Sequence, residues 1–113
     1  MGVDSVSVAE EYFARMRDGD LSVTELFHEE AELVGLGMTR RGKAAVADFY
    51  RKVIERAGPS PRPAGPLLGN GSRVAAEVFI DLTEEVSVHA VDIFVVEEGL
   101  IRSLTYFLCD QPS

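Results

Sequence analysis

Residues 86–96 constrain the fold most, because this run is rich in β-branched residues and contains neither glycine nor proline. That composition predicts a strand from the middle of a sheet. Successive side chains of a strand point to opposite faces. One face then carries Val86, Val88, Ala90, Asp92, Phe94 and Val96, and the other carries His89, Val91, Ile93 and Val95. Since both faces are apolar, we expect both to be covered.

Asp92 is the exception on its face. A carboxylate among apolar neighbours must find hydrogen bonds or take up a proton, because an isolated buried charge is costly. One interpretation is a strand-end aspartate whose oxygens accept hydrogen bonds from backbone N–H groups. The other is a functional carboxyl group inside a binding site.

The rest of the chain predicts helices first and strands afterwards. Two capping-box patterns, at residues 7–10 and 22–25, predict helices over 7–17 and 22–28. A further helical pattern covers 42–57 and ends at Gly58-Pro59. Strands are predicted over 30–35, 66–69, 73–82, 86–97 and 100–109, with a stiff proline-rich connector over 59–66 and a hairpin at Asn70-Gly71.

This order predicts a single α+β domain over residues 1–113, in which a curved antiparallel sheet wraps around three N-terminal helices. The helices can cover only one face of the sheet. A homodimer that buries the outer face is the simplest solution. The alternative is an apolar sheet face that stays partly exposed.

Composition narrows the function classes. The net charge of −8 and the scattered basic residues argue against nucleic-acid binding. No apolar stretch is long enough to span a membrane and no signal peptide is evident, so we expect a cytoplasmic protein. Cys109 is the only cysteine, which excludes an internal disulfide, and we expect it to be a packing residue. The two histidines are far apart in sequence, so we predict no metal site and no cofactor.

Two tyrosines share the inward direction with Asp92. Tyr12 and Tyr50 lie on the apolar stripes of the first and third predicted helices. A tyrosine in such a position commonly serves packing, with its hydroxyl reaching solvent or a carbonyl group. Two phenols and a carboxyl group that converge can instead form a hydrogen-bonded network that stabilises an oxyanion.

With these residues in place, the sequence resembles the ketosteroid isomerase branch of the NTF2-like (SnoaL-like) superfamily over about residues 8–110. The resemblance rests on order and spacing. Its markers are Tyr12 seven residues before Gly19-Asp20, Leu26-Phe-His-Glu-Glu-Ala31, Gly42-Lys-Ala-Ala-Val-Ala-Asp-Phe-Tyr-Arg51, Val91-Asp-Ile-Phe94 and Gly99-Leu-Ile-Arg102.

The resemblance implies a cone-shaped fold and a role for each polar residue. Tyr12 falls on the family's oxyanion-hole tyrosine, Asp92 on its protonated oxyanion-hole aspartate, and Tyr50 on a supporting tyrosine. The family's general base is an aspartate at the end of the first strand. Gly35 occupies that place here, so the usual base is absent.

Glu77 is the candidate for a replacement base, but its direction is open. Apolarity alone leaves it in solvent, whereas an ungapped count from Asp92 turns it inward, and a slip of one residue reverses the result. The residues expected to line a cavity are apolar for the most part, and suit a hydrophobic small-molecule ligand with a carbonyl or phenol oxygen. They are Met16, Val34, Leu36, Phe94, Leu104, Tyr106 and Leu108.

The sequence therefore supports two functional hypotheses. One is a ketosteroid isomerase-like enzyme that acts on a steroid-, terpenoid- or polyketide-like carbonyl compound, with isomerisation, cyclisation or dehydration as its chemistry. The other is a binding protein that holds such a compound without turnover. The missing base keeps the second hypothesis open.

Overall fold

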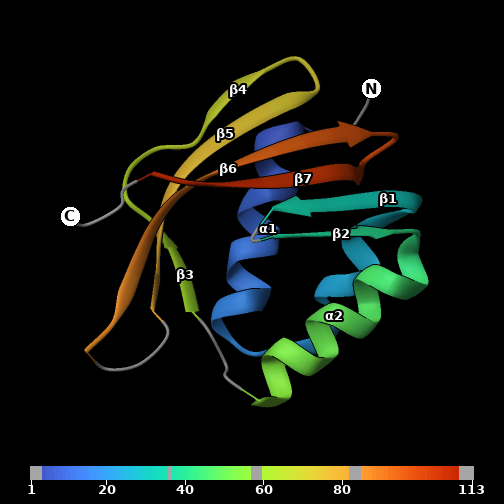
Figure 1. Ribbon diagram of the computed structural model, residues 1–113. Helices are drawn as coiled ribbons and strands as arrows, with labels where there is room; N and C mark the ends of the chain where they lie inside the picture. The colour runs from blue at the N-terminus through green and yellow to red at the C-terminus, as the bar shows by residue number, and fades with distance from the viewer. Residues whose placement is uncertain (1–3, 36, 57–59, 82–84, 110–113) are drawn as a thin grey trace.

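The computed structural model describes residues 4–35, 37–56, 60–81 and 85–109. Its helices are α1 (Ser5–Arg17), the short 3₁₀ helix η1 (Leu21–Leu26) and α2 (Lys43–Arg56). Its strands are β1 (Phe27–Gly35), β2 (Met38–Arg41), β3 (Ser60–Pro63), β4 (Leu68–Asn70), β5 (Arg73–Asp81), β6 (Ser87–Glu97) and β7 (Leu100–Leu108). Figure 1 shows the helices against one side of a curved sheet, which confirms the α+β prediction.

The strands form one sheet in the order β2-β1-β7-β6-β5-β3, with β4 also paired to β5. The pairs β5–β6 and β6–β7 are antiparallel, as predicted. However, β1 pairs with β7 in parallel, so the sheet is mixed and the prediction of a purely antiparallel sheet is wrong here. The last strand of the chain, β7, lies beside β1 and runs in the same direction.

The helices differ from the predictions at their N-termini. The N-cap of α1 is Asp4, one turn before the predicted capping box, and Ser7 donates its hydroxyl to the Asp4 carboxylate. In η1 the carboxylate of Asp20 accepts the backbone N–H of Ser22 at 2.9 Å, so the second predicted box is not used either. Within the described residues, no helix has both the length and the apolar character needed to cross a membrane.

Two short strands carry no clear sequence signal. β2 pairs antiparallel with β1, and its four residues include Arg40 and Arg41. β3 lies inside the proline-rich connector and pairs with β5 at the edge of the sheet. An edge strand tolerates proline because the missing N–H can face outward. The predicted strand at 66–69 is β4, which begins two residues later and ends one residue later.

A bulge at Arg102 sets the direction of the side chains in β7. Val96 pairs with Ile101 and Val95 pairs with Ser103, so Arg102 is an extra residue in the strand. A bulge of one residue moves all later side chains to the opposite face. Leu104 and Tyr106 are therefore buried, whereas Phe107 is 54% exposed.

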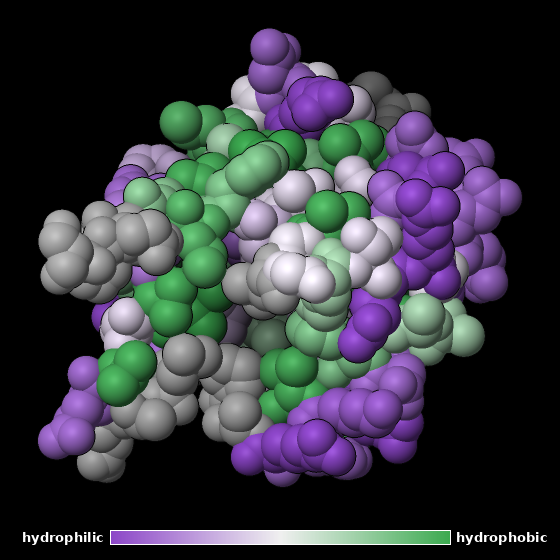
Figure 2. Space-filling model, viewed as in Figure 1, coloured by the Kyte–Doolittle hydropathy of each residue, from purple (hydrophilic) through white to green (hydrophobic). Residues whose placement is uncertain are grey.

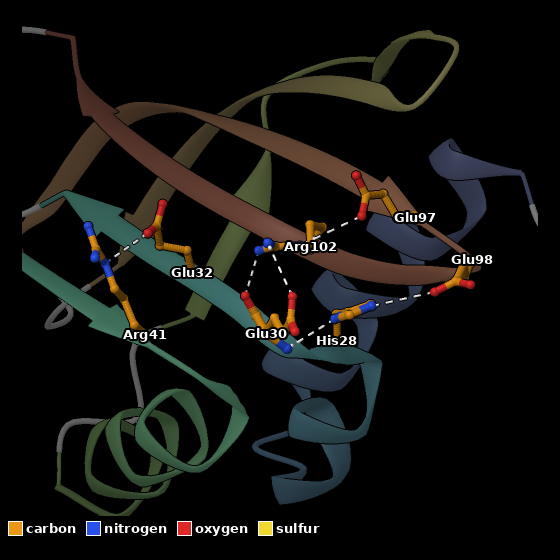
Figure 3. Close-up of polar contacts among 7 residues, drawn as sticks. All are labelled: His28, Glu30, Glu32, Arg41, Glu97, Glu98 and Arg102. Carbon is orange, nitrogen blue, oxygen red and sulfur yellow. Dashed lines mark hydrogen bonds and ion pairs between the residues drawn. The ribbon is translucent and has the colours of Figure 1, made fainter.

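The same arginine holds an irregular stretch of β1 in place. β1 breaks its pairing with β7 between Phe27 and Glu32. Arg102 donates to the backbone oxygen of Glu30 at 2.5 Å, and its guanidinium lies 3.7 Å from the carboxylate of Glu97 (Figure 3). His28 braces this stretch further, since its Nδ1 accepts the backbone N–H of Glu30 at 3.0 Å.

The outer face of the sheet is apolar and partly exposed. Val91, Ile93 and Val95 of β6 are only half-buried. Figure 1 shows α1 behind β6 and β7, so the viewer faces this outer side. Figure 2, from the same direction, shows hydrophobic residues gathered over the left-hand part of the sheet, and hydrophilic residues over α2 and over the right-hand ends of the strands. This is the face for which the sequence predicts a partner.

Candidate functional site

The three tyrosines of the chain meet inside the fold. The hydroxyl of Tyr12 lies 2.9 Å from that of Tyr50 and 3.2 Å from that of Tyr106. The hydroxyls of Tyr50 and Tyr106 are 2.5 Å apart. All three side chains are buried. We call these residues the phenol cluster. The structure thus brings Tyr12 and Tyr50 together and adds a third member.

Each phenol comes from a different element. Tyr12 lies on the buried stripe of α1, with Val8 and Met16 one turn away on either side, and Tyr50 follows Val46 on the buried stripe of α2. Tyr106 comes from β7. The rings pack edge to face with neighbouring aromatics, as in the pair of Tyr12 and Phe94 with centroids 5.3 Å apart. The aromatic packing fixes where the hydroxyls point.

The hydrogen bonds of the phenol cluster form a closed triangle. A phenol has one proton to donate, and three hydroxyls joined in three pairs use all three protons among themselves. A ligand oxygen can therefore accept a hydrogen bond from the cluster only if one contact opens. The longest contact, between Tyr12 and Tyr106, is the one that opens at least cost.

Asp92 is the unsatisfied group of the site. Its residue surface is 1% exposed, and neither carboxyl oxygen has a hydrogen-bond partner among the described residues. It is paired across the sheet with Tyr106, and both side chains point inward. Burial raises the pKa of Asp92 to about 7. The neutral acid is therefore favoured below neutrality, and it carries a proton with no acceptor. The strand-end interpretation is not supported, because no backbone N–H reaches these oxygens within the described residues.

The phenols keep their protons. Burial raises the pKa of Tyr12 well above its usual value, and the nearby Tyr106 and Asp92 raise it further. Burial, together with the neighbouring Tyr106 and Tyr12, also raises the pKa of Tyr50. The pKa of Tyr106 is raised mainly by burial and then by Asp92. The site is thus a set of neutral hydrogen-bond donors in an apolar enclosure.

Gly35, where the resemblance places the general base, contacts the backbone of Tyr106. Its φ of +130° is one that residues with side chains rarely adopt. A Cβ atom on Gly35 would lie 2.6 Å from the carbonyl oxygen of Tyr106 and 2.9 Å from its Cβ. The position of the missing base is therefore filled by the neighbouring strand.

Glu77 does not join the phenol cluster. The alternation of β5 turns Val74, Ala76 and Val78 into the core, which places Glu77 on the outer face. Its side chain is 58% exposed, and its carboxylate lies 2.7 Å from Nε2 of His89. The inward alternative for this residue, and with it the replacement base, is thus corrected by the register of β5 with β6.

The predicted lining residues divide into two groups. Met16, Phe94 and Leu104 are buried in the core that surrounds the phenol cluster. Val34 alternates with the buried Leu33 and lies on the opposite face of β1, because side chains of a strand alternate. Leu108 is the last residue of β7 and is 45% exposed. Leu36 lies outside the described residues. Cys109, expected to pack, is exposed.

Two other features of the described surface are separate from this site. Shallow depressions flank α2, one beside Ala47 and Arg51 and the other beside Phe49 and Lys52, and neither includes a member of the phenol cluster. The described residues contain no group of three or more histidine, cysteine or acidic side chains placed to hold a metal ion.

The sequence did not predict that Tyr106 is a hydrogen-bonding member of the phenol cluster. It was expected only as a lining residue. The available signal was its position on the same face as Leu104, combined with the fact that the chain has only two other tyrosines, both expected inside. The exact partner of Asp92 across the sheet depended on the bulge at Arg102.

Comparisons with known proteins agree with this architecture. Residues 9–104 match the model of the SnoaL-like domain. No curated protein matches the sequence. A proposed ketosteroid isomerase from Kribbella flavida superimposes with a TM-score of 0.83 at 18% identity, covering 96% of this chain and 80% of that one. A proposed polyketide cyclase from Sinorhizobium meliloti gives a TM-score of 0.79 at 16% identity, with 92% and 99% covered.

A third similar structure is an epoxide hydrolase of the LEH-like type from M. tuberculosis, with a TM-score of 0.83 at 16% identity and 93% and 82% covered. At such identities the likeness shows the fold, and these structures carry three different reaction types on it. The match to the domain model spans most of the sequence. The chain therefore belongs to the SnoaL-like family.

Proposed function

We propose that this protein binds a hydrophobic carbonyl compound with its oxygen at Tyr12 and Asp92, and that it stabilises the enolate-type oxyanion formed from that compound. The observation that carries the proposal is Asp92, a buried carboxyl group with no partner beside three phenols that keep their protons. Buried polar groups are almost always hydrogen-bonded, so a deeply buried exception points to a ligand.

Tyr12 and Asp92 would act as the two donors. When the ligand oxygen arrives, the 3.2 Å contact between Tyr12 and Tyr106 opens and the proton of Tyr12 turns to the ligand. Tyr50 then donates to the oxygen of Tyr12, which strengthens the bond that Tyr12 makes, because chained hydrogen bonds polarise one another. Donors aimed at a developing negative charge in a dry site lower the barrier to enolate formation.

Asp92 would have a second role through its pKa near 7. At neutral pH both forms are populated, so the neutral form can donate to the oxyanion and the ionised form can accept a proton. Groups with a pKa close to the working pH are the most effective general acids and bases. Isomerisation, cyclisation and dehydration of a carbonyl compound all use such proton transfers.

A binding protein without turnover is the second candidate, and one observation favours it. The position of the family's base is closed by the contact of Gly35 with Tyr106, and the carboxylate of Glu77 lies outside. The same donors would then hold a steroid-like or polyketide-like ligand by its oxygen. Asp92 remains the only carboxyl group that the described core contains.

Binding of 2-naphthol tests the donors, because its ionised form mimics an enolate. We expect Tyr12→Phe to lower the affinity about ten-fold or more, since it removes a hydrogen bond to a charged group. Thr105→Val is the matched control, because it removes a hydroxyl from β7 at a residue whose side chain alternates with that of the buried Tyr106. Equal affinities in the wild type and Tyr12→Phe would refute the role of Tyr12.

Turnover separates the two candidates. A β,γ-unsaturated cyclic ketone should be converted to the conjugated isomer by the wild type and not by Asp92→Asn, which keeps a donor but cannot carry the proton. Glu77→Gln should have no effect. Tight 2-naphthol binding by a protein with no conversion of any such ketone would favour the binding protein.

A further inference from the structure

We infer that Gly35 and Tyr106 form a matched pair, in which glycine at residue 35 lets Tyr106 enter the phenol cluster and act as a positioning residue for the hydroxyl of Tyr12. The inference deepens the proposed function and rests on it, because Tyr12 is the hydroxyl that the proposal assigns to the ligand. It explains why the position of the family's base holds the one residue type without a side chain.

Gly35 and the backbone of Tyr106 are in close steric contact. Gly35 ends β1 with a φ of +130°, and the backbone of Tyr106 lies directly against its Cα. The nitrogen, carbonyl oxygen and Cβ of Tyr106 would all lie within 3.1 Å of a Cβ at residue 35. These are backbone atoms and the first side-chain atom, which cannot rotate away. Any larger residue must push β7 away from β1.

This close approach places the hydroxyl of Tyr106 in the phenol cluster. The parallel pairing of β1 with β7 continues to Val34 and Thr105, so Tyr106 is the next residue along the strand. Its side chain points inward, and its hydroxyl lies 2.5 Å from that of Tyr50 and 3.2 Å from that of Tyr12. Hydrogen bonds weaken steeply beyond their normal length. A Cβ on residue 35 would force β7 to move, and that movement displaces the Tyr106 hydroxyl from its contacts with Tyr12 and Tyr50.

Tyr106 helps to hold the hydroxyl of Tyr12 in position. Without Tyr106, the oxygen of Tyr12 has only Tyr50 as a partner within the phenol cluster, and the oxygen of Tyr50 loses its shortest contact. When the ligand has opened the contact between Tyr12 and Tyr106, Tyr106 supports Tyr12 through Tyr50, because its hydroxyl can donate to Tyr50, which in turn donates to Tyr12. Without Tyr106 that chain loses its first member. A donor held less firmly stabilises a bound oxyanion less, because preorganisation is what gives such a site its strength.

The contact between Gly35 and Tyr106 also affects whether a base can stand at residue 35. A side chain at residue 35 is excluded as long as the backbone of residue 106 approaches this closely, so the approach that brings Tyr106 into the cluster leaves no room for a carboxylate there. The chain has a third phenol in place of a second buried carboxyl group. Gly35→Asp is therefore expected to disrupt the cluster and not to restore a base.

Two readouts test the pair. The first uses the protein without ligand, in which hydroxyl protons of the buried cluster should give slowly exchanging proton NMR signals far downfield. The second is the ionised fraction of bound 2-naphthol at pH 7, measured by absorption. We expect Tyr106→Phe to fold, to lose these NMR signals, and to lower both the ionised fraction and the affinity, the latter about five- to ten-fold. Unchanged signals and an unchanged ionised fraction would overturn the role of Tyr106.

A double-mutant cycle tests Gly35. Gly35→Ala should reduce the ionised fraction in the wild type but have no further effect on it in Tyr106→Phe, where no hydroxyl remains to be displaced. Gly37→Ala is the matched control, since Gly37 also has a positive φ, of +76°, but a Cβ there meets nothing within 4 Å. Additive effects of Gly35→Ala and Tyr106→Phe on the ionised fraction would overturn the pairing.

The outcomes distinguish this inference from the proposed function. If the wild type binds no 2-naphthol, the proposed function fails, and the NMR signals of the ligand-free protein still decide the pairing. If Gly35→Ala does not fold, the strained φ of residue 35 is enough to explain it, and the NMR signals and the ionised fraction in Tyr106→Phe decide the role of Tyr106. Equal stability of Gly35→Ala and Gly37→Ala, with the NMR signals retained in both, would refute the pairing.

Discussion

Replacing Asp92 by asparagine should remove most of the acid-side pH dependence of stability. Burial raises the pKa of this carboxyl group from 3.8 to about 7. Between these two values the folded protein holds a proton that the unfolded chain releases. The difference of about three pH units corresponds to about 4 kcal/mol of unfolding free energy. Asparagine has nearly the same shape but does not titrate in this range.

The sign follows from proton binding. In this window the folded state binds more protons than the unfolded state, so the free energy of unfolding falls as the pH rises and the contribution is lost above pH 7. From pH 5 to pH 8 the wild type should lose about 2 to 3 kcal/mol through this one group. Asp92→Asn should lose none of that amount, whatever its absolute stability.

Urea denaturation followed by far-UV circular dichroism at pH 5 and pH 8 measures the difference, since the chain has no tryptophan to report by fluorescence. Asp81→Asn is the control. Asp81 is a partly exposed carboxylate whose pKa is lowered by its hydrogen bonds with Arg62 and Ser87, so its removal should not flatten the profile. If the wild type and Asp92→Asn lose equal free energy between the two pH values, the buried neutral acid does not exist.

Three further predictions concern the site and the sheet. The affinity for a neutral ketone should fall as the pH rises through about 7 in the wild type and stay constant in Asp92→Asn, as binding titrations would show. We also expect a homodimer through the outer face of the sheet, so Phe107→Glu should give a monomer in sedimentation analysis while Leu68→Glu should not. Deletion of Arg102 removes the extra residue but leaves Tyr106 opposite Asp92, so 2-naphthol binding should be retained, whereas stability in urea should fall because the hydrogen bond to the carbonyl of Glu30 is lost.

The elements of the fold were predictable where local pattern decides them. Residues 42–57 carry a strong helical period and form α2 within one residue of the prediction. The Asn70-Gly71 turn joins β4 to β5 as expected, with Gly71 at a positive φ. The strands β2 and β3 were missed because their polar or proline-rich residues become strands only through pairing with β1 and β5. Such pairing is a tertiary effect that no local pattern reports.

The site was predictable in its members but not in its connections. Tyr12, Tyr50 and Asp92 are identified by polarity on faces that must be buried, and the structure buries all three. The direction of Glu77 was undecidable from sequence because both parities of β5 present some apolar residues. It is decided by the register with β6, which pairs Ala76 with Asp92 and so turns the neighbouring Glu77 outward.

The bulge at Arg102 decides which residue of β7 lies opposite Asp92. With a regular hairpin, the turn at Glu98-Gly99 would set Thr105 opposite Asp92. The extra residue in β7 moves the pairing on by one and sets Tyr106 there instead. Arg102 stabilises that register from outside, since it holds the carbonyl of Glu30 in the irregular part of β1 (Figure 3).

The irregularities of β1 and β7 therefore act together on one residue. The bulge turns the phenol of Tyr106 inward, and Gly35 at the end of β1 lets its backbone approach closely enough for the hydroxyl to reach Tyr12 and Tyr50. If either were absent, Asp92 would lose the phenol beside it. Burial keeps Asp92 protonated at acidic pH, because an apolar enclosure disfavours the ionised carboxylate. The placement of the phenol opposite Asp92 thus depends on two backbone features that lie outside the set of polar residues themselves.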